Sequence, residues 1–129
     1  MKNQESKYSF PKREHLCGET RITRLFNNGT AAFVYPLRAV FCVYQSENEI
    51  PVKVLVGAAK KRFKTAVARN RLKRLMREAY RLNKTEIVQN TAERKISIEI
   101  AFSYIGNEIL DFDVIEKSMK SILQKIAEN

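Results

Sequence analysis

The sequence has few of the residues that build a protein active site. Its 129 residues include one histidine, His15, and two cysteines, Cys17 and Cys42, which show no CxxC spacing. A metal centre or a catalytic triad normally needs a cluster of such side chains. We therefore expect no catalytic residue and no metal ligand in this chain, and we expect both cysteines to be buried, reduced thiols. Any catalysis in which the chain takes part would use chemistry supplied by a partner.

Long apolar runs are also missing. No stretch approaches the roughly 18 apolar residues that a membrane-spanning helix needs. The first ten residues are mostly polar and lack the apolar segment of a secretory signal. We therefore expect a cytoplasmic protein without a membrane partner. With 44% apolar and 29% charged residues, the chain fits one α+β domain over residues 16–129, which follows an extended or flexible arm, residues 1–15.

Acidic residues are nearly absent from residues 60–84. This segment holds eleven Lys and Arg and a single acid, Glu78, so its charge of +10 equals the net charge of the whole chain. Apolar residues recur between the cations at helical spacing, which predicts a folded helix over residues 65–83 with Thr65 as its N-cap. A polyanion, and nucleic acid in particular, is the expected partner.

This helix is predicted to be two-sided. At about 100° per residue, its apolar side chains fall within an arc of roughly 120°. The arc contains Ala68, Leu72, Leu75, Met76, Ala79 and Leu82. The opposite side is cationic, and guanidinium groups bind phosphate oxygens in pairs. Asn70 can bond a base edge, a sugar hydroxyl or a neighbouring side chain.

The remaining elements are predicted from periodicity and turn signals, and give the order α, β, β, β, α, β, α. A first helix begins near Glu19 and ends before the turn at Asn27, Asn28 and Gly29. Alternating or continuous apolar runs predict strands at residues 37–44, 52–58 and 96–102. The run at residues 52–58 is expected to extend into a further short strand or a bend, which would be the third strand before the basic helix. Residues 84–95 are predicted to be a polar connector, and a capping box at Asp113 and Glu116 to begin the last helix.

Residues 60–81 resemble the signature segment of the bacterial ribonuclease P protein component. The hallmark is the helix start Arg69-Asn70-Arg71, followed by Lys73-Arg74 and by Arg77. The helix near residue 22, Gly29, the strands and the final helix come in the order of that family, so the resemblance covers most of the chain.

The resemblance implies a single-domain α-β sandwich with a left-handed βαβ crossover, an exception to the usual right-handed rule. It also implies an accessory subunit of a ribozyme. In this family the catalytic RNA, with Mg²⁺, hydrolyses precursor tRNA to free the mature 5′ end. The implied partners are ribonuclease P RNA and precursor tRNA, and no protein partner is required.

The resemblance also implies two RNA-binding regions. The first matches the basic segment of the family and comprises Lys60, Lys61, Arg62, Lys64, Arg69, Asn70, Arg71, Lys73, Arg74 and Arg77. The second is a cleft for the single-stranded 5′ leader, with candidates Ile22, Phe26, Phe41, Cys42 and Tyr44.

Members of the family tend to carry aromatics where this chain has Ile22, Phe26 and Cys42, and only Phe26 keeps that type. Because base stacking contributes ~1–3 kcal/mol per base, leader binding is expected to depend on Phe26, Phe41 or Tyr44. Strand alternation puts Phe41 and Cys42 on opposite faces of the sheet, so one of them is core, and the sequence leaves open which.

Two other functions remain alternatives. A non-enzymatic, ribosome-associated RNA-binding protein would have the same charge pattern, because related folds serve several functions. A DNA-binding regulator is disfavoured, since the sequence shows no helix-turn-helix pair.

Overall fold

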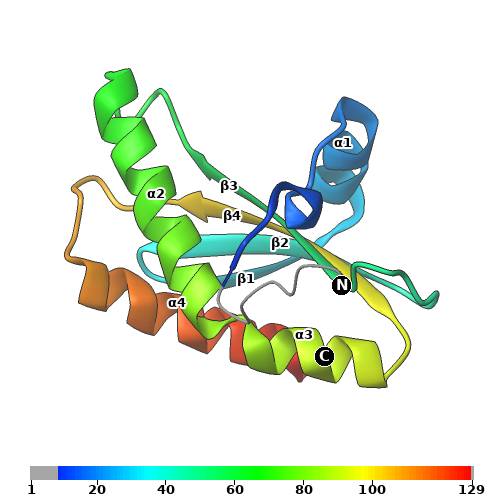
Figure 1. Ribbon diagram of the computed structural model, residues 1–129. Coiled ribbons are helices and arrows are strands. Elements are labelled where there is room, and N and C mark those ends of the chain that lie inside the picture. The colour runs from blue at the N-terminus through cyan, green and yellow to red at the C-terminus, as the bar shows by residue number, and fades with distance from the viewer. Residues whose placement is uncertain (1–8, 129) are drawn as a thin grey trace, which may run out of the picture.

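The computed structural model describes residues 9–128. Four helices and four strands follow a short 3₁₀ turn, η1 (Figure 1). In chain order the elements are η1 (Lys12–Glu14), α1 (Glu19–Asn28), β1 (Thr30–Val34), β2 (Leu37–Tyr44), β3 (Val52–Ala58), α2 (Ala66–Asn83), α3 (Thr85–Glu93), β4 (Ser97–Tyr104) and α4 (Phe112–Ala127).

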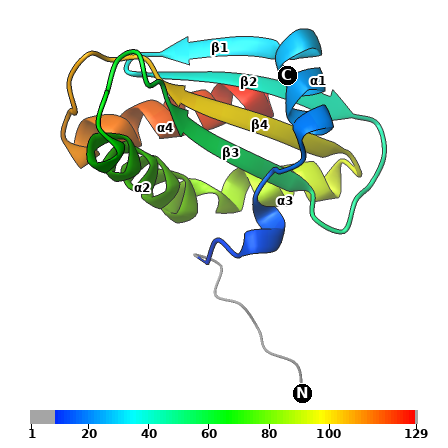
Figure 2. The ribbon, with the colours of Figure 1, turned by 90° about the horizontal axis from the view of Figure 1, so that it is seen from above.

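The strands form one mixed sheet in the order β1-β2-β4-β3. Neighbours are antiparallel except β3 and β4, which run parallel with Val54 opposite Ile100. The parallel pair is joined through α2 and α3. Seen from the α1 side with β3 and β4 pointing upward, β4 lies to the right of β3 and the connection passes behind the sheet (Figure 2). This arrangement makes the crossover left-handed. The α+β class and this crossover agree with the fold that the resemblance implied.

The sheet separates two apolar clusters, since α1 lies on one side of it and α4 on the other (Figures 1 and 2). The larger cluster lies between the sheet and α2, α3 and α4, and it includes Phe41, Phe102, Met76 and Ile122. The smaller one lies under α1, where Leu25 packs with Leu16, Val40 and Ala101. Alternation along β2 supplies both clusters, because successive side chains point to opposite faces. The helix α1 therefore covers a sheet face that the other helices leave open.

Several expectations about the elements are confirmed. The start of α1, the strands β2 and β3, and Thr65 as the N-cap of α2 all occur where the sequence predicted them, whereas α1 continues through Asn27 and Asn28 to its C-cap at Gly29. The predicted connector over residues 84–95 instead contains α3, and the third strand precedes β2 as β1 rather than following β3.

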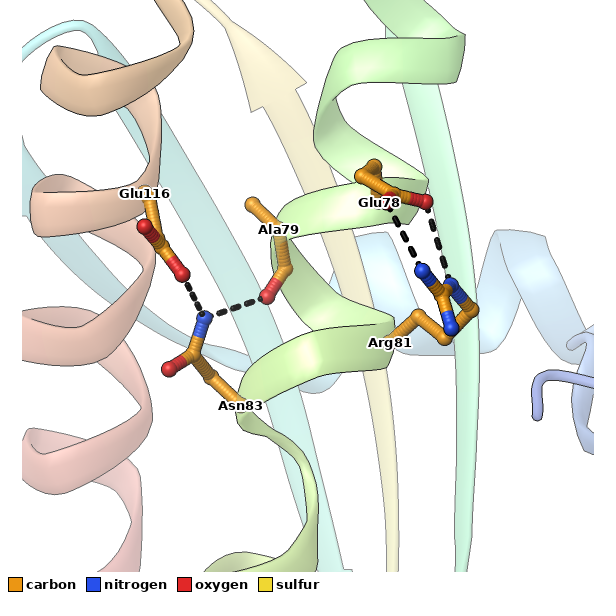
Figure 3. Close-up of polar contacts among 5 residues, drawn as sticks. All are labelled: Glu78, Ala79, Arg81, Asn83 and Glu116. Atoms are coloured by element: carbon orange, nitrogen blue, oxygen red, sulfur yellow. Dashed lines mark hydrogen bonds and ion pairs between the residues drawn. The ribbon is translucent and has the colours of Figure 1, made fainter. Parts of the chain in front are cut away.

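The start of α4 differs from the predicted capping box. The N-cap residue is Asp111, which makes no side-chain cap bond, and Asp113 lies inside the helix. Glu116 accepts a hydrogen bond from Asn83 Nδ2 at 2.9 Å, and the same nitrogen donates to the Ala79 carbonyl at 2.8 Å (Figure 3). The carboxylate thus joins α4 to the end of α2 instead of capping its own helix.

The described part of the expected N-terminal arm lies against the domain. Leu16 N donates to Val54 O at 2.8 Å, and His15 forms an isolated bridge to Val54, so this segment lies along the edge of β3. Glu14 accepts from the buried Lys84 Nζ at 2.5 Å. Residues 9–15 of the expected arm thus lie against the domain, and residues 1–8 lie outside the described part. No helix within residues 9–128 is long and apolar enough to cross a membrane.

Candidate nucleic-acid interface

The helix α2 is fixed by its cap and by one apolar side. Thr65 Oγ1 accepts a hydrogen bond from Ala68 N at 3.2 Å, which satisfies one of the free amides of the first turn. Leu72, Met76 and Ala79 are fully buried against the sheet and α4. Tyr80, which the helical wheel did not include, is buried with them, while Leu75 is only half-buried. The buried side is thus rotated slightly from the predicted arc.

The outward side of α2, Arg69 in its first turn and the loop before the helix form a cationic surface, which we call the basic face. Its side chains are exposed except Arg69 and Lys73, which are half-buried. The basic face consists of Lys60, Lys61, Arg62, Lys64, Arg69, Asn70, Arg71, Lys73, Arg74 and Arg77. All ten predicted residues are thus on one connected stretch of loop and helix.

The one acid of this segment is already paired. Arg81 binds Glu78 through two hydrogen bonds, from Nε at 3.1 Å and from Nη2 at 2.7 Å (Figure 3). Hydrogen bonding by Arg81 lowers the pKa of Glu78 from its ordinary value. Within residues 9–128, no ion pair or hydrogen bond involves the side chains of Arg71, Lys73, Arg74 or Arg77. Their charge is therefore available to a polyanion.

The loop before α2 is anchored by Phe63. Its ring is 8% exposed and meets Tyr104 edge-on, with 5.8 Å between ring centroids. Arg69 Nη1 donates to the Phe63 carbonyl at 2.7 Å, and Arg62 Nη1 donates to Asn107 Oδ1 at 2.9 Å. These contacts fix the loop, so Arg62 and Arg69 of the basic face also have a structural role.

The second candidate region lies around α1, which crosses the open face of the sheet and divides it (Figure 2). On one flank, Arg21 Nη1 is 3.6 Å from Glu99 Oε2, and the Arg24 guanidinium is 5.7 Å from the Tyr44 ring centroid. Ile22 and Phe26 lie about 100° and 140° around the helix from Arg21, on the other flank. This second flank faces the end of the sheet that holds Phe33 and Arg38.

The five predicted cleft residues are consequently separated. Phe41 is 4% exposed and belongs to the core under α4, so it lies on the wrong face of the sheet for this cleft. Cys42 faces α1 and packs under it beside Ile22. Phe26 is 45% exposed, and Tyr44 lies across α1 from it. The choice between Phe41 and Cys42, which the sequence left open, is settled with Phe41 as core.

The cysteines do not follow the expectation of burial. Cys17 is exposed and Cys42 is half-buried, and both are free thiols. Cys17 directly follows the buried Leu16 and precedes Gly18, in the segment that leads into α1, so the chain turns its side chain outward there.

Sequence reasoning missed two features of the open sheet face. Phe33 on β1 is 55% exposed, and the Arg38 guanidinium on β2 lies 5.6 Å from its ring centroid. Glu99 on β4 is 6% exposed and accepts a hydrogen bond from Tyr44 Oη at 3.2 Å. Burial and the adjacent Glu99 raise the pKa of Tyr44 above its ordinary value of 10.0. The one available signal was Glu99 itself, a charge within the apolar alternation of residues 96–102.

Nowhere in residues 9–128 do three or more His, Cys, Asp or Glu side chains come together as a metal site. The exposed cations and aromatics of this surface offer phosphate binding and base stacking.

Comparisons with known proteins identify a family. The family model described as Ribonuclease P matches residues 10–127. A ribonuclease P protein component of Porphyromonas gingivalis is 42% identical over 95% of this chain and 89% of its own length.

Two solved structures have the same fold. The ribonuclease P protein of Staphylococcus aureus superimposes with a TM-score of 0.67 at 19% identity, covering 89% of this chain and 95% of that one. The ribonuclease P protein of Thermotoga maritima gives 0.68 at 19% identity, covering 88% and 97%.

Proposed function

The chain belongs to the bacterial ribonuclease P protein family and is the protein component of that endoribonuclease, and from this premise we propose how its surfaces divide the work. The basic face binds ribonuclease P RNA. The flank of α1 that carries Phe26, with the sheet residues Phe33 and Arg38, binds the single-stranded 5′ leader of precursor tRNA. The observation that carries the proposal is the exposed cationic side of α2, where the side chains of Arg71, Arg74 and Arg77 make no ion pair or hydrogen bond within residues 9–128.

The RNA phosphate backbone suits the basic face. Arg71, Arg74 and Arg77 are exposed along one side of a helix that is capped at its start and buried on its other side. A polyanion therefore meets a row of donors on a backbone that is already ordered. Little backbone entropy has to be lost on binding. The same residues in a ribosome-associated protein would bind RNA equally well, but membership of this family removes that alternative.

The flank of α1 that carries Phe26 suits an unpaired strand. Phe26 is exposed on α1, and Phe33 with Arg38 offers a second aromatic and a cation at the same sheet face. Base–aromatic stacking tolerates different sequences, as a subunit that processes many precursor tRNAs requires.

The hydrolysis itself is assigned to the RNA subunit with Mg²⁺. Glu78 is the single carboxylate in the basic segment, and Arg81 occupies both of its oxygens. Mg²⁺ prefers oxygen ligands and is commonly bound through phosphates. In this proposal the protein orients the two RNAs, in the cytoplasm where tRNA precursors are transcribed, and needs no other protein.

The division of surfaces can be tested by leader-dependent affinity. The reconstituted holoenzyme should bind a precursor with a five-nucleotide leader more tightly than mature tRNA, and Phe26→Ala should remove about 1–3 kcal/mol of that difference. Val114→Ala, on α4 and of comparable exposure at 42%, is the matched control and should leave the difference intact. Equal affinity of the wild-type holoenzyme for precursor and mature tRNA would overturn the leader assignment.

A further inference from the structure

A separate cavity lies on the flank of α1 opposite Phe26. Its volume is about 140 Å³, and its walls come from α1, the end of β2, the loop after it, β3 and β4. Five of its side chains are charged or aromatic, namely Arg21, Arg24, Tyr44, Lys53 and Glu99. We call this cavity the Glu99 pocket.

The unusual member of the pocket is the carboxylate. Glu99 is 6% exposed in a chain whose net charge is +10. A charge buried to this extent is costly unless other groups stabilise it. Tyr44 Oη donates to Oε1 at 3.2 Å, whereas Arg21 Nη1 is 3.6 Å from Oε2, beyond hydrogen-bond distance. A carboxylate has about four acceptor sites, so Oε2 keeps acceptor capacity facing the cavity.

The groups around the carboxylate suit one nucleotide of an unpaired strand. Arg21, Arg24 and Lys53 surround the opening with positive charge, which attracts phosphate. The Tyr44 ring, with the Arg24 guanidinium 5.7 Å away, offers a stacking surface. A carboxylate accepts from the exocyclic amines of adenine, cytosine or guanine. Uracil has no exocyclic amine, and its single ring N–H lies between two carbonyl oxygens that the carboxylate repels.

We propose that the Glu99 pocket binds an unpaired RNA base that carries an exocyclic amine, and that Glu99 rejects uracil. The inference rests on the proposed function for its RNA partner. The base comes either from the precursor leader, where the strand continues past α1, or from an unpaired segment of ribonuclease P RNA. Both sources present the same chemistry.

The first arm of the test uses the reconstituted holoenzyme and precursors whose leaders are uniformly A, C or U. The wild type should bind the A and C leaders roughly tenfold more tightly than the U leader. Glu99→Gln keeps the side-chain shape but adds a donor, so the ratio should fall to about one. Arg21→Gln is the matched control. It breaks the same ion pair and keeps the carboxylate, so affinity drops for all leaders while the ratio persists.

The second arm covers the other source. Chemical footprinting of ribonuclease P RNA with each variant should show one unpaired A, C or G whose protection is lost with Glu99→Gln and kept with Arg21→Gln. Either arm alone supports the pocket and identifies the source of the base. If Glu99→Gln matches the wild type in both arms and in melting temperature, the inference is overturned. The proposed function survives that result. It is overturned only if the holoenzyme binds a precursor with a leader no more tightly than mature tRNA.

Discussion

At the scale of single residues, the two sides of α2 should respond differently to truncation. Arg74 is exposed on the basic face, whereas Leu72 is fully buried. We expect Arg74→Ala to weaken binding to ribonuclease P RNA by ~1.5–3 kcal/mol and to change folding stability by less than ~0.5 kcal/mol. Leu72→Ala should lower the free energy of unfolding by ~2–5 kcal/mol.

Filter binding and urea denaturation of both variants provide the measurement. Leu75→Ala is a useful comparison. Because Leu75 is half-buried, its truncation should lower the free energy of unfolding less than Leu72→Ala does. A loss of stability for Arg74→Ala as large as its loss of RNA binding would mean that the basic face is structural.

Tyr80 gives a prediction about pH. Its hydroxyl is buried without a hydrogen-bond partner among residues 9–128. Burial, aided by the nearby Glu14, raises the pKa of Tyr80 far above the ordinary 10.0. The folded state thus holds this proton where the unfolded chain releases it, so its contribution to stability is complete below pH 10 and falls as the pH rises above 10.

We expect Tyr80→Phe to keep or raise stability at pH 7 by up to ~1 kcal/mol, because it removes an unpaired polar group. Between pH 10 and 11.5 the variant should lose less stability than the wild type in thermal melts. Tyr35→Phe, at a tyrosine that is 63% exposed, is the control and should follow the wild-type profile. Identical alkaline profiles for wild type and Tyr80→Phe would contradict the assignment.

The same residues show what the sequence can reveal locally. Helical spacing identified the buried and cationic sides of α2, because a capped helix repeats the same geometry at every turn. It could not identify Tyr80 as buried or Phe41 as core. Those outcomes depend on which face of the sheet α2 and α4 cover, and that is a property of the packed molecule.

At the scale of elements, the N-cap of α2 should connect stability to RNA binding. Thr65 Oγ1 holds the first turn, next to the loop that carries Lys60 and Lys61. We expect Thr65→Ala to cost about 1 kcal/mol of stability and also to weaken RNA binding, since the first turn positions Arg69 and Asn70. Thr65→Ser retains the oxygen and should behave like the wild type in both assays. An unchanged melting temperature for Thr65→Ala would show that the cap is not formed in solution.

The elements that sequence reasoning missed have weak local signals. The helix α3 begins one residue after α2 ends, and Lys84 between them keeps a helical backbone, so no Gly or Pro marks the boundary. The strand β1 has five residues at the edge of the sheet and none that is fully buried. Its formation depends on pairing with β2 rather than on its own pattern.

At the scale of the whole molecule, the cationic charge should govern RNA affinity. If the basic face neutralises 6 to 10 phosphates, affinity for ribonuclease P RNA should fall by roughly 10³ to 10⁵ between 50 and 200 mM monovalent salt. Removing Arg74 should reduce the slope of log affinity against log salt by about one. A slope near zero in equilibrium binding would contradict a phosphate-dominated interface.

The tertiary arrangement was the part least accessible from the sequence. The resemblance implied the left-handed crossover, which periodicity could not supply. The basic face was predictable because its residues are consecutive in one helix and its preceding loop. The Glu99 pocket was not, since it joins Tyr44 at the end of β2 to Glu99 on β4, which are 55 residues apart in the chain. The Phe26 flank of α1 was not either, because it depends on where α1 packs on the sheet.

The most direct test is multiple-turnover cleavage of a 5′-extended precursor tRNA by the cognate ribonuclease P RNA at low Mg²⁺, with and without this protein. We expect marked stimulation at the mature 5′ site with the wild-type protein, and much less with Arg74→Ala at the same concentration. If the folded protein binds the RNA tightly but gives no stimulation, its proposed role in orienting the two RNAs is wrong.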